Sequence, residues 1–203
     1  MNENSTIHRL IPLACLSTLF ICLPHLATGQ VNQDNIYDPG ILKPTDSNLK
    51  VAIHAPAPNF TLPSLKGGKT TLSQYREKKN VVLSFVPAAW TPVCSAQWPG
   101  YHLAKEYFDE TDTILIGITV DNIPTLHAWT KEMGGLWFEV LSDFYPHGEV
   151  AGNYGILRRS GVSERALFLI DKKGIIQWID IHDINKRPPL DDLVKAMRAI
   201  KKD

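Results

Sequence analysis

Apolar and polar residues follow two different periods along this chain. Residues 81–86, VVLSFV, form an apolar run of the kind found in a buried strand, and residues 114–120 form a second such run. Residues 190–201 instead place apolar side chains three and four positions apart, which predicts a helix with one buried face. Strands and helices therefore both contribute to the core.

The intervening segments extend this pattern. Residues 166–170 and 175–181 are apolar and are separated by the turn 171–174, so they predict an antiparallel hairpin. The other expected elements are a turn at 66–69, helices over 92–109, 124–133 and 149–154, and a short strand at 140–141. Strands that alternate with helices, then a hairpin and a last helix, predict an α/β fold of the thioredoxin-like type, with a central mixed β-sheet flanked by helices.

The first 50 residues differ from the rest. Residues 1–29 predict a signal peptide: His8 and Arg9 precede an apolar stretch over 10–23, and small residues end it at 27–29. This leader predicts export to a periplasmic or extracellular location. An uncleaved membrane anchor is the alternative, and a lipoprotein is a weaker one because the residues before Cys15 and Cys22 match a lipobox poorly.

The polar stretch that follows predicts a flexible linker. Residues 30–50 are rich in Asn, Asp, Pro and Gly and show no periodicity. One domain then occupies residues 51–203. Its length suits a single hydrophobic core.

Charge narrows the range of partners. The chain has 21 Lys and Arg against 21 Asp and Glu, so its formal net charge is zero. Nothing in this balance favours nucleic acid as a partner. We find no spacing of His, Cys or carboxylates that indicates a metal site, and we expect no cofactor.

Cys94 is the residue with the clearest chemical potential. It follows the apolar run 81–86 where a strand gives way to a helix. Unpaired N–H groups and the helix dipole favour an anion at a helix N-terminus, and the thiolate is the nucleophilic form of cysteine. Removal of the leader would take Cys15 and Cys22 with it, which leaves Cys94 as the only thiol and excludes a disulfide within the chain.

Three motifs resemble the peroxiredoxins, the AhpC/TSA family of the thioredoxin-like superfamily. Pro87-x-x-x-Thr91-x-x-Cys94 resembles their active-site signature, and residues 163–171, SERALFLID, resemble the segment that supplies an arginine, here Arg165. Residues 141–150 are similar to the AhpE-type, one-cysteine branch. The resemblance covers about residues 51–200.

This resemblance implies a thiol peroxidase. Cys94 would attack a hydroperoxide, Arg165 would stabilise charge, Thr91 would turn its hydroxyl inward to the thiolate, and Pro87 would shield the site. An external thiol, from a thioredoxin-like protein or a small molecule, would then react with the sulfenic acid product; Cys94 of a second molecule is the alternative. The resemblance also suggests a homodimer.

Other interpretations remain open. Arg165 alone could be a surface ion-pair partner of Glu164 or Asp171, and Thr91 alone could be an ordinary helix cap. Gln97 stands where many relatives carry Glu. Trp90 and Trp98 are core or interface residues, or they line a peroxide entrance. A non-enzymatic redox sensor or partner-binding module is the alternative function.

Overall fold

The computed structural model of the protein describes residues 31–200. The expected leader lies outside these residues, and so does the alternative of an anchor formed by it. Among the described residues, no helix combines the length and the apolar character needed to cross a membrane.

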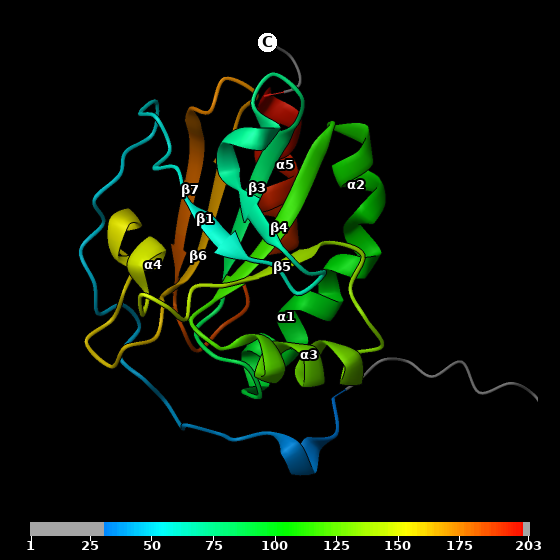
Figure 1. Cartoon of the computed structure of the whole chain (residues 1–203), viewed down its shortest axis with the longest axis vertical. Coiled ribbons are helices and arrows are strands. Elements are labelled where there is room, and N and C mark those ends of the chain that lie inside the picture. The colour runs from blue at the N-terminus through cyan, green and yellow to red at the C-terminus, as the bar shows by residue number, and fades with distance from the viewer. Residues whose placement is uncertain (1–30, 201–203) are drawn as a thin grey trace, which may run out of the picture.

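A five-stranded mixed sheet forms the centre of the fold, which confirms the expected fold class (Figure 1). Its strand order is β5-β4-β3-β6-β7. The pairs β3–β4 and β4–β5 are parallel, whereas β3–β6 and β6–β7 are antiparallel. The strands are β3 (Asn80–Phe85), β4 (Thr113–Thr119), β5 (Glu139–Ser142), β6 (Arg165–Ile170) and β7 (Ile176–His182).

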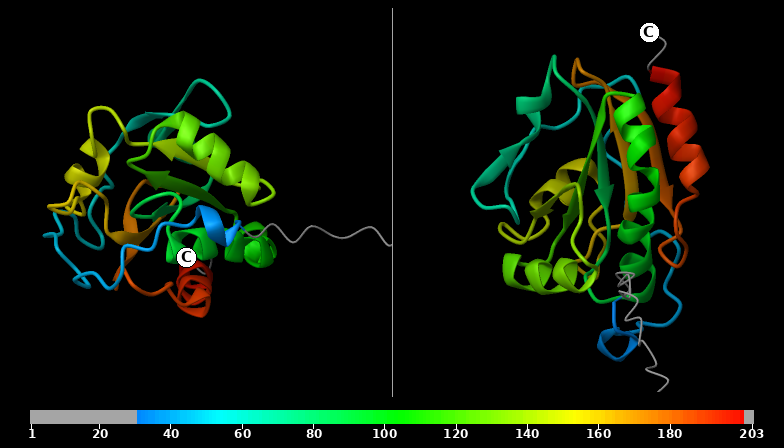
Figure 2. Two further views of the ribbon diagram at one scale, coloured as in Figure 1. Left: turned by 90° about the horizontal axis from the view of Figure 1, so that it is seen from below. Right: turned by 90° about the vertical axis from the view of Figure 1, so that its right-hand side faces the viewer.

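The helices cover both faces of this sheet. On one side lie α1 (Pro92–Gly100), α2 (Lys105–Glu110) and α5 (Leu190–Ile200), as Figure 2 shows. The other side carries α4 (Glu149–Tyr154) and the separate hairpin of β1 (Thr61–Pro63) and β2 (Lys69–Thr71), while α3 (Ile123–Glu132) packs beside β5. Three short 3-10 helices complete the described elements: Gln33–Asn35, Leu72–Tyr75 and Tyr101–Ala104.

Alternation along β3 divides the core in two. Val82 packs in the cluster with α1, α2 and α5, whereas Val81, Leu83 and Phe85 pack in the cluster with α4. Successive side chains of a strand point to opposite faces, so a strand buried on both faces is apolar at nearly every position. This is why residues 81–86 are apolar except for Ser84, whose buried hydroxyl accepts hydrogen bonds from Gln97 and Trp98.

The helix expected over residues 92–109 is divided. It ends as α1 at Gly100, continues as a 3-10 turn and resumes as α2 at Lys105. Pro99 lies inside α1, and a proline removes a backbone donor and clashes with the preceding turn. The single helix was therefore a wrong prediction, although its extent was close.

Residues 31–50, expected as a flexible linker, pack along the domain. The backbone N–H of Tyr37 donates to the carbonyl of Trp90 at 2.8 Å, and that of Lys50 donates to the carbonyl of Tyr154 at 3.1 Å. Val31 is buried. In Figure 1 this segment, in blue, runs past the lower end of the sheet and along its side. Apart from the 3-10 helix Gln33–Asn35 it has no regular secondary structure, and its polar sequence did not predict these contacts.

Candidate active site

Cys94 is the third residue of α1, immediately beyond the central strand β3. The connecting loop is tightly held: the Ala89 N–H donates to the Asp121 carboxylate at 2.8 Å, and Trp90 adopts a left-handed φ of 59°. Such a φ is uncommon outside glycine. The loop thus turns sharply and brings the first turn of α1 over the end of the sheet.

Strand pairing places Arg165 beside Cys94. Arg165 is the first residue of β6, which runs antiparallel to β3, so the start of β6 meets the end of β3. The Arg165 Nη2 lies 3.5 Å from the Cys94 Sγ, at hydrogen-bond distance for sulfur. Both side chains are buried: Cys94 has no exposed surface and Arg165 is 2% exposed. Water therefore screens this contact only weakly.

Two further groups fix the Arg165 guanidinium. The carbonyl of Ile184 accepts from its Nε at 3.2 Å and from its Nη2 at 3.0 Å, and the Gln97 Oε1 accepts from its Nη1 at 2.6 Å. No carboxylate takes part in these bonds. Glu164, the neighbour proposed as an ion-pair partner from sequence, instead pairs with Arg158. The surface ion-pair interpretation of Arg165 is therefore wrong.

Gln97 is the site residue that sequence reasoning undervalued. It is 4% exposed, and its Nε2 donates to the Tyr101 hydroxyl at 3.0 Å and to the Ser84 hydroxyl at 3.4 Å. Burial raises the pKa of Tyr101, which therefore keeps its proton. Gln97 orients Arg165 without neutralising it, whereas a glutamate would bring a negative charge. Its place three residues after Cys94, one turn of helix on, was the available signal.

Thr91 and Pro87 line the same pocket, but the Thr91 hydroxyl differs from expectation. It donates to the carbonyl of Ala88 at 2.9 Å and makes no side-chain bond to the start of α1. Its proton is thus engaged by the Ala88 carbonyl. The hydrogen bond expected from this hydroxyl to the thiolate is therefore not made in this structure, and neither is the side-chain bond of the ordinary-cap alternative. The hydroxyl oxygen retains its lone pairs as acceptors.

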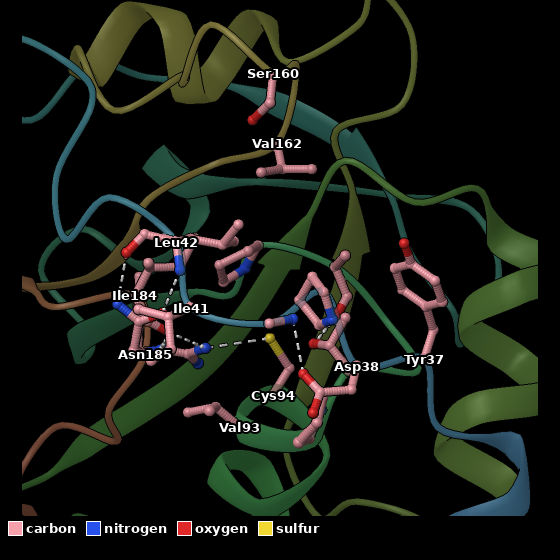
Figure 3. Close-up of a pocket in the computed structure, with 17 residues that line it drawn as sticks. Tyr37, Asp38, Ile41, Leu42, Val93, Cys94, Ser160, Val162, Ile184 and Asn185 are labelled. Carbon is pink, nitrogen blue, oxygen red and sulfur yellow. Dashed lines mark hydrogen bonds between the residues drawn. The ribbon is translucent and has the colours of Figure 1, made fainter.

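One pocket of about 530 Å³ is bordered by all four residues predicted from sequence, Pro87, Thr91, Cys94 and Arg165 (Figure 3). Cys94 and Arg165 both line it, and the N-terminal residues 37–42 form a wall that the sequence did not predict. The remaining lining residues are Ala88, Pro92, Val93, Ser160, Val162, Ile184 and Asn185. A pocket of this volume can hold a small molecule next to Cys94.

The tryptophans near Cys94 belong mainly to the core. Trp98 has no exposed surface and packs against Trp129, with ring centroids 5.0 Å apart. Trp90 is half-buried against the same cluster, and neither Trp90 nor Trp98 lines the pocket of Figure 3. The core interpretation is thus confirmed for Trp98, and its role as an entrance residue is not.

Cys94 is the only cysteine among residues 31–200, and it is free. In the same range we find no group of three His, Cys, Asp or Glu placed to hold a metal ion. The chemistry of the site therefore depends on one thiol, one guanidinium and neutral polar groups.

Fold and site together define a thioredoxin-like protein with a buried thiol set against an arginine at a helix N-terminus. The comparisons with known proteins agree with this class and refine it. The family model described as "AhpC/TSA family" matches residues 53–179, and the chain belongs to that family. The resemblance drawn from the sequence motifs is thereby confirmed.

Individual relatives carry peroxidase names. Alkyl hydroperoxide reductase E of Mycobacterium tuberculosis is 35% identical over 130 residues, which cover 64% of this chain and 84% of the relative. A chloroplastic 2-cysteine peroxiredoxin of Chattonella marina is 30% identical over 161 residues, 75% of this chain and 82% of the relative. The crystal structure of reduced Plasmodium vivax 2-Cys peroxiredoxin aligns with a TM-score of 0.69 at 29% identity, over 74% of this chain and 82% of that one.

Proposed function

We propose that the protein is an exported thiol-dependent peroxidase that reduces hydrogen peroxide and organic hydroperoxides through Cys94. The observation that carries this proposal is the 3.5 Å contact between the Cys94 sulfur and the buried Arg165 guanidinium, in the lining of this pocket. A thiol with an adjacent fixed cation is suited to nucleophilic attack. The names of the relatives support the same reaction class.

The reaction transfers one oxygen atom to sulfur. The Cys94 thiolate attacks the terminal oxygen of the hydroperoxide, a sulfur–oxygen bond forms, and the O–O bond breaks. The leaving oxygen takes a proton and departs as water or an alcohol, and Cys94 becomes a sulfenic acid. Sulfur is oxidised and the peroxide is reduced by two electrons.

The surrounding groups have distinct roles in this step. Arg165 stabilises the negative charge that moves from sulfur to the leaving oxygen. The Thr91 hydroxyl, whose proton is bound to the Ala88 carbonyl, offers its oxygen to accept a hydrogen bond from the O–H of the peroxide. Pro87 is buried and has no N–H, so it excludes water without adding a donor.

We further propose a one-cysteine cycle. A second thiol must attack the sulfenic acid to release water and form a mixed disulfide, and a further thiol must then release Cys94. Because the other cysteines, Cys15 and Cys22, lie in the expected leader, the reductant is an external thiol, from a thioredoxin-like protein or a small molecule. Two-cysteine relatives exist, so this cycle rests on the cysteine content of this chain.

Rapid mixing of the reduced protein with peroxide tests the proposal. The fluorescence of Trp90 and Trp98 should change at a rate proportional to peroxide concentration, and Cys94→Ser should abolish the change. With an added thiol, the wild type should also consume peroxide over many turnovers. If the wild-type protein reacts with peroxide no faster than free cysteine does, the result would instead support the redox-sensor or partner-binding alternative.

Export and assembly need separate measurements. An intact mass that corresponds to a chain starting near residue 30, measured on protein recovered outside the cytoplasm, would support cleavage of the leader. A retained leader in the membrane fraction would support the anchor alternative. Sedimentation of the reduced protein would test the proposed homodimer.

A further inference from the structure

The N-terminal segment 37–42 borders the pocket of Cys94, although it precedes the matched family region at residues 53–179. We propose that this segment binds the organic group of an uncharged hydroperoxide and so sets the preference for organic peroxides over hydrogen peroxide. The inference rests on the proposed peroxidase function and adds a specificity determinant to it.

The segment is anchored at both of its ends. At Tyr37, the backbone N–H donates to the carbonyl of Trp90 at 2.8 Å. At Leu42, the Asn185 side chain makes two backbone bonds: its Oδ1 accepts from the Leu42 N–H at 2.8 Å, and its Nδ2 donates to the Leu42 carbonyl at 2.8 Å. These anchors hold residues 38–41 in the lining of the pocket, and Figure 3 shows Asp38 and Ile41 near Cys94.

Asn185 also links this wall to the reacting groups. It follows Ile184, whose carbonyl accepts two hydrogen bonds from Arg165. The loop that orients the guanidinium therefore also orients the wall. An organic group of the substrate that binds between the wall and Arg165 would therefore be held in a fixed position relative to Cys94.

A buried ion pair reinforces the anchor just beyond Leu42. Arg158 and Glu164 are paired, with side chains 5% and 0% exposed. The Arg158 Nη2 donates to the carbonyl of Lys43 at 2.7 Å, and the Glu164 Oε1 accepts from the backbone N–H of Asp46 at 2.6 Å. Charged partners of this kind make stronger hydrogen bonds than neutral ones. The wall is thus attached to a rigid part of the domain.

The wall presents apolar surface to the pocket. Pro39, Ile41 and Leu42 contribute to the lining, together with the apolar side chains of Val93, Val162 and Ile184. Ile41 is 95% exposed, so its side chain remains in water in the free protein and would gain from contact with an apolar group.

Volume and charge define the ligand further. A pocket of about 530 Å³ far exceeds what the two oxygen atoms of hydrogen peroxide occupy. Asp38 and Arg165 are the charged residues of the lining. The Arg165 guanidinium is already bonded to Ile184, Gln97 and Cys94, so a carboxylate on the ligand would meet the repulsion of Asp38 without gaining these donors. The fitting substrate therefore has an uncharged aliphatic or aromatic group.

The test compares two peroxides in Ile41→Ser, whose exposed position makes a folding defect unexpected. Second-order rate constants for cumene hydroperoxide and hydrogen peroxide are measured by rapid mixing. Removal of the apolar contact should lower the cumene hydroperoxide constant about tenfold. The hydrogen peroxide constant should stay within about twofold. Leu103→Ser, at an 87% exposed position outside this pocket, is the matched control and should change neither constant.

A second variant tests the anchor. Asn185→Ala removes both hydrogen bonds to Leu42. As in Ile41→Ser, the rate constant for cumene hydroperoxide should fall relative to that for hydrogen peroxide. Equal changes for both peroxides, or no change in either variant, would overturn the specificity role while leaving the peroxidase intact. A wild-type protein that reacts with neither peroxide would instead overturn the proposed function itself.

Discussion

The contribution of Arg165 can be estimated from its geometry. Unit charges 3.5 Å apart, the distance from its Nη2 to the Cys94 sulfur, attract by about 5 kcal/mol at an effective dielectric constant of about 20. Part of this attraction already stabilises the thiolate before reaction. Loss of one preorganised donor in comparable sites slows the reaction by about 10² to 10³. We therefore expect Arg165→Met to lower the rate constant with hydrogen peroxide by about that factor.

The assay is the peroxide-dependent change in tryptophan fluorescence, with thiol titration and far-ultraviolet circular dichroism to confirm an intact, folded protein. Arg165→Lys keeps the charge but loses the planar set of donors that reaches Ile184, Gln97 and Cys94 together. Its rate constant should therefore lie between those of the wild type and Arg165→Met. Arg187→Met is the control: this exposed arginine donates to the Ala96 carbonyl of α1 but lies outside the pocket. A folded Arg165→Met that reacts within about threefold of the wild type would refute the electrostatic reasoning.

Two further predictions concern stability. In Gly117→Ala, the new Cβ would lie 2.7 Å from a ring carbon of the buried Trp98. We expect the free energy of unfolding, measured in urea, to fall by about 1–3 kcal/mol. The control is Gly152→Ala in α4, where the new Cβ has open space, and this variant should be neutral or slightly more stable. Hydrogen bonds from Lys172 and Lys79 lower the pKa of Asp112 from 3.8 to about 2. As pH falls, the unfolded chain binds this proton first, so the stabilisation present above about pH 4 is lost by about pH 2. Because 44% of the Asp112 side chain is exposed, Asp112→Asn should cost less than about 1 kcal/mol at pH 7, and its unfolding midpoint should converge with that of the wild type near pH 2.

Local patterns predicted most of the sheet. The strand at 81–86, the antiparallel pair β6–β7 and helix α5 all appear close to their expected bounds. These elements are buried on a regular period, so their positions follow from side chains that are near in sequence. The break after Pro99 was also visible in principle, since a proline inside a helix interrupts its hydrogen bonds.

The geometry of the site was less predictable. The motifs identified Cys94 and Arg165, and strand pairing brings them together. The hydrogen bonds of Gln97 and the orientation of the Thr91 hydroxyl were not predicted. Both depend on competition among nearby acceptors: the Ala88 carbonyl takes the Thr91 proton, and Gln97 lies between Arg165 and Tyr101. A sequence states which groups are present, but their pairing depends on distances set by the whole fold.

The N-terminal wall shows the same limit at longer range. A polar stretch without periodicity predicts disorder when it cannot bury enough apolar surface to offset the entropy of ordering. Residues 37–46 meet that description, yet their backbone bonds to Asn185, Arg158 and Glu164, groups 115 to 143 residues away. Two of these side chains are already fixed as a buried ion pair, so they bind the segment with little further loss of freedom. Preorganised polar partners can therefore order a segment that its own composition would leave free, and in this chain they hold it beside the pocket that Cys94 lines.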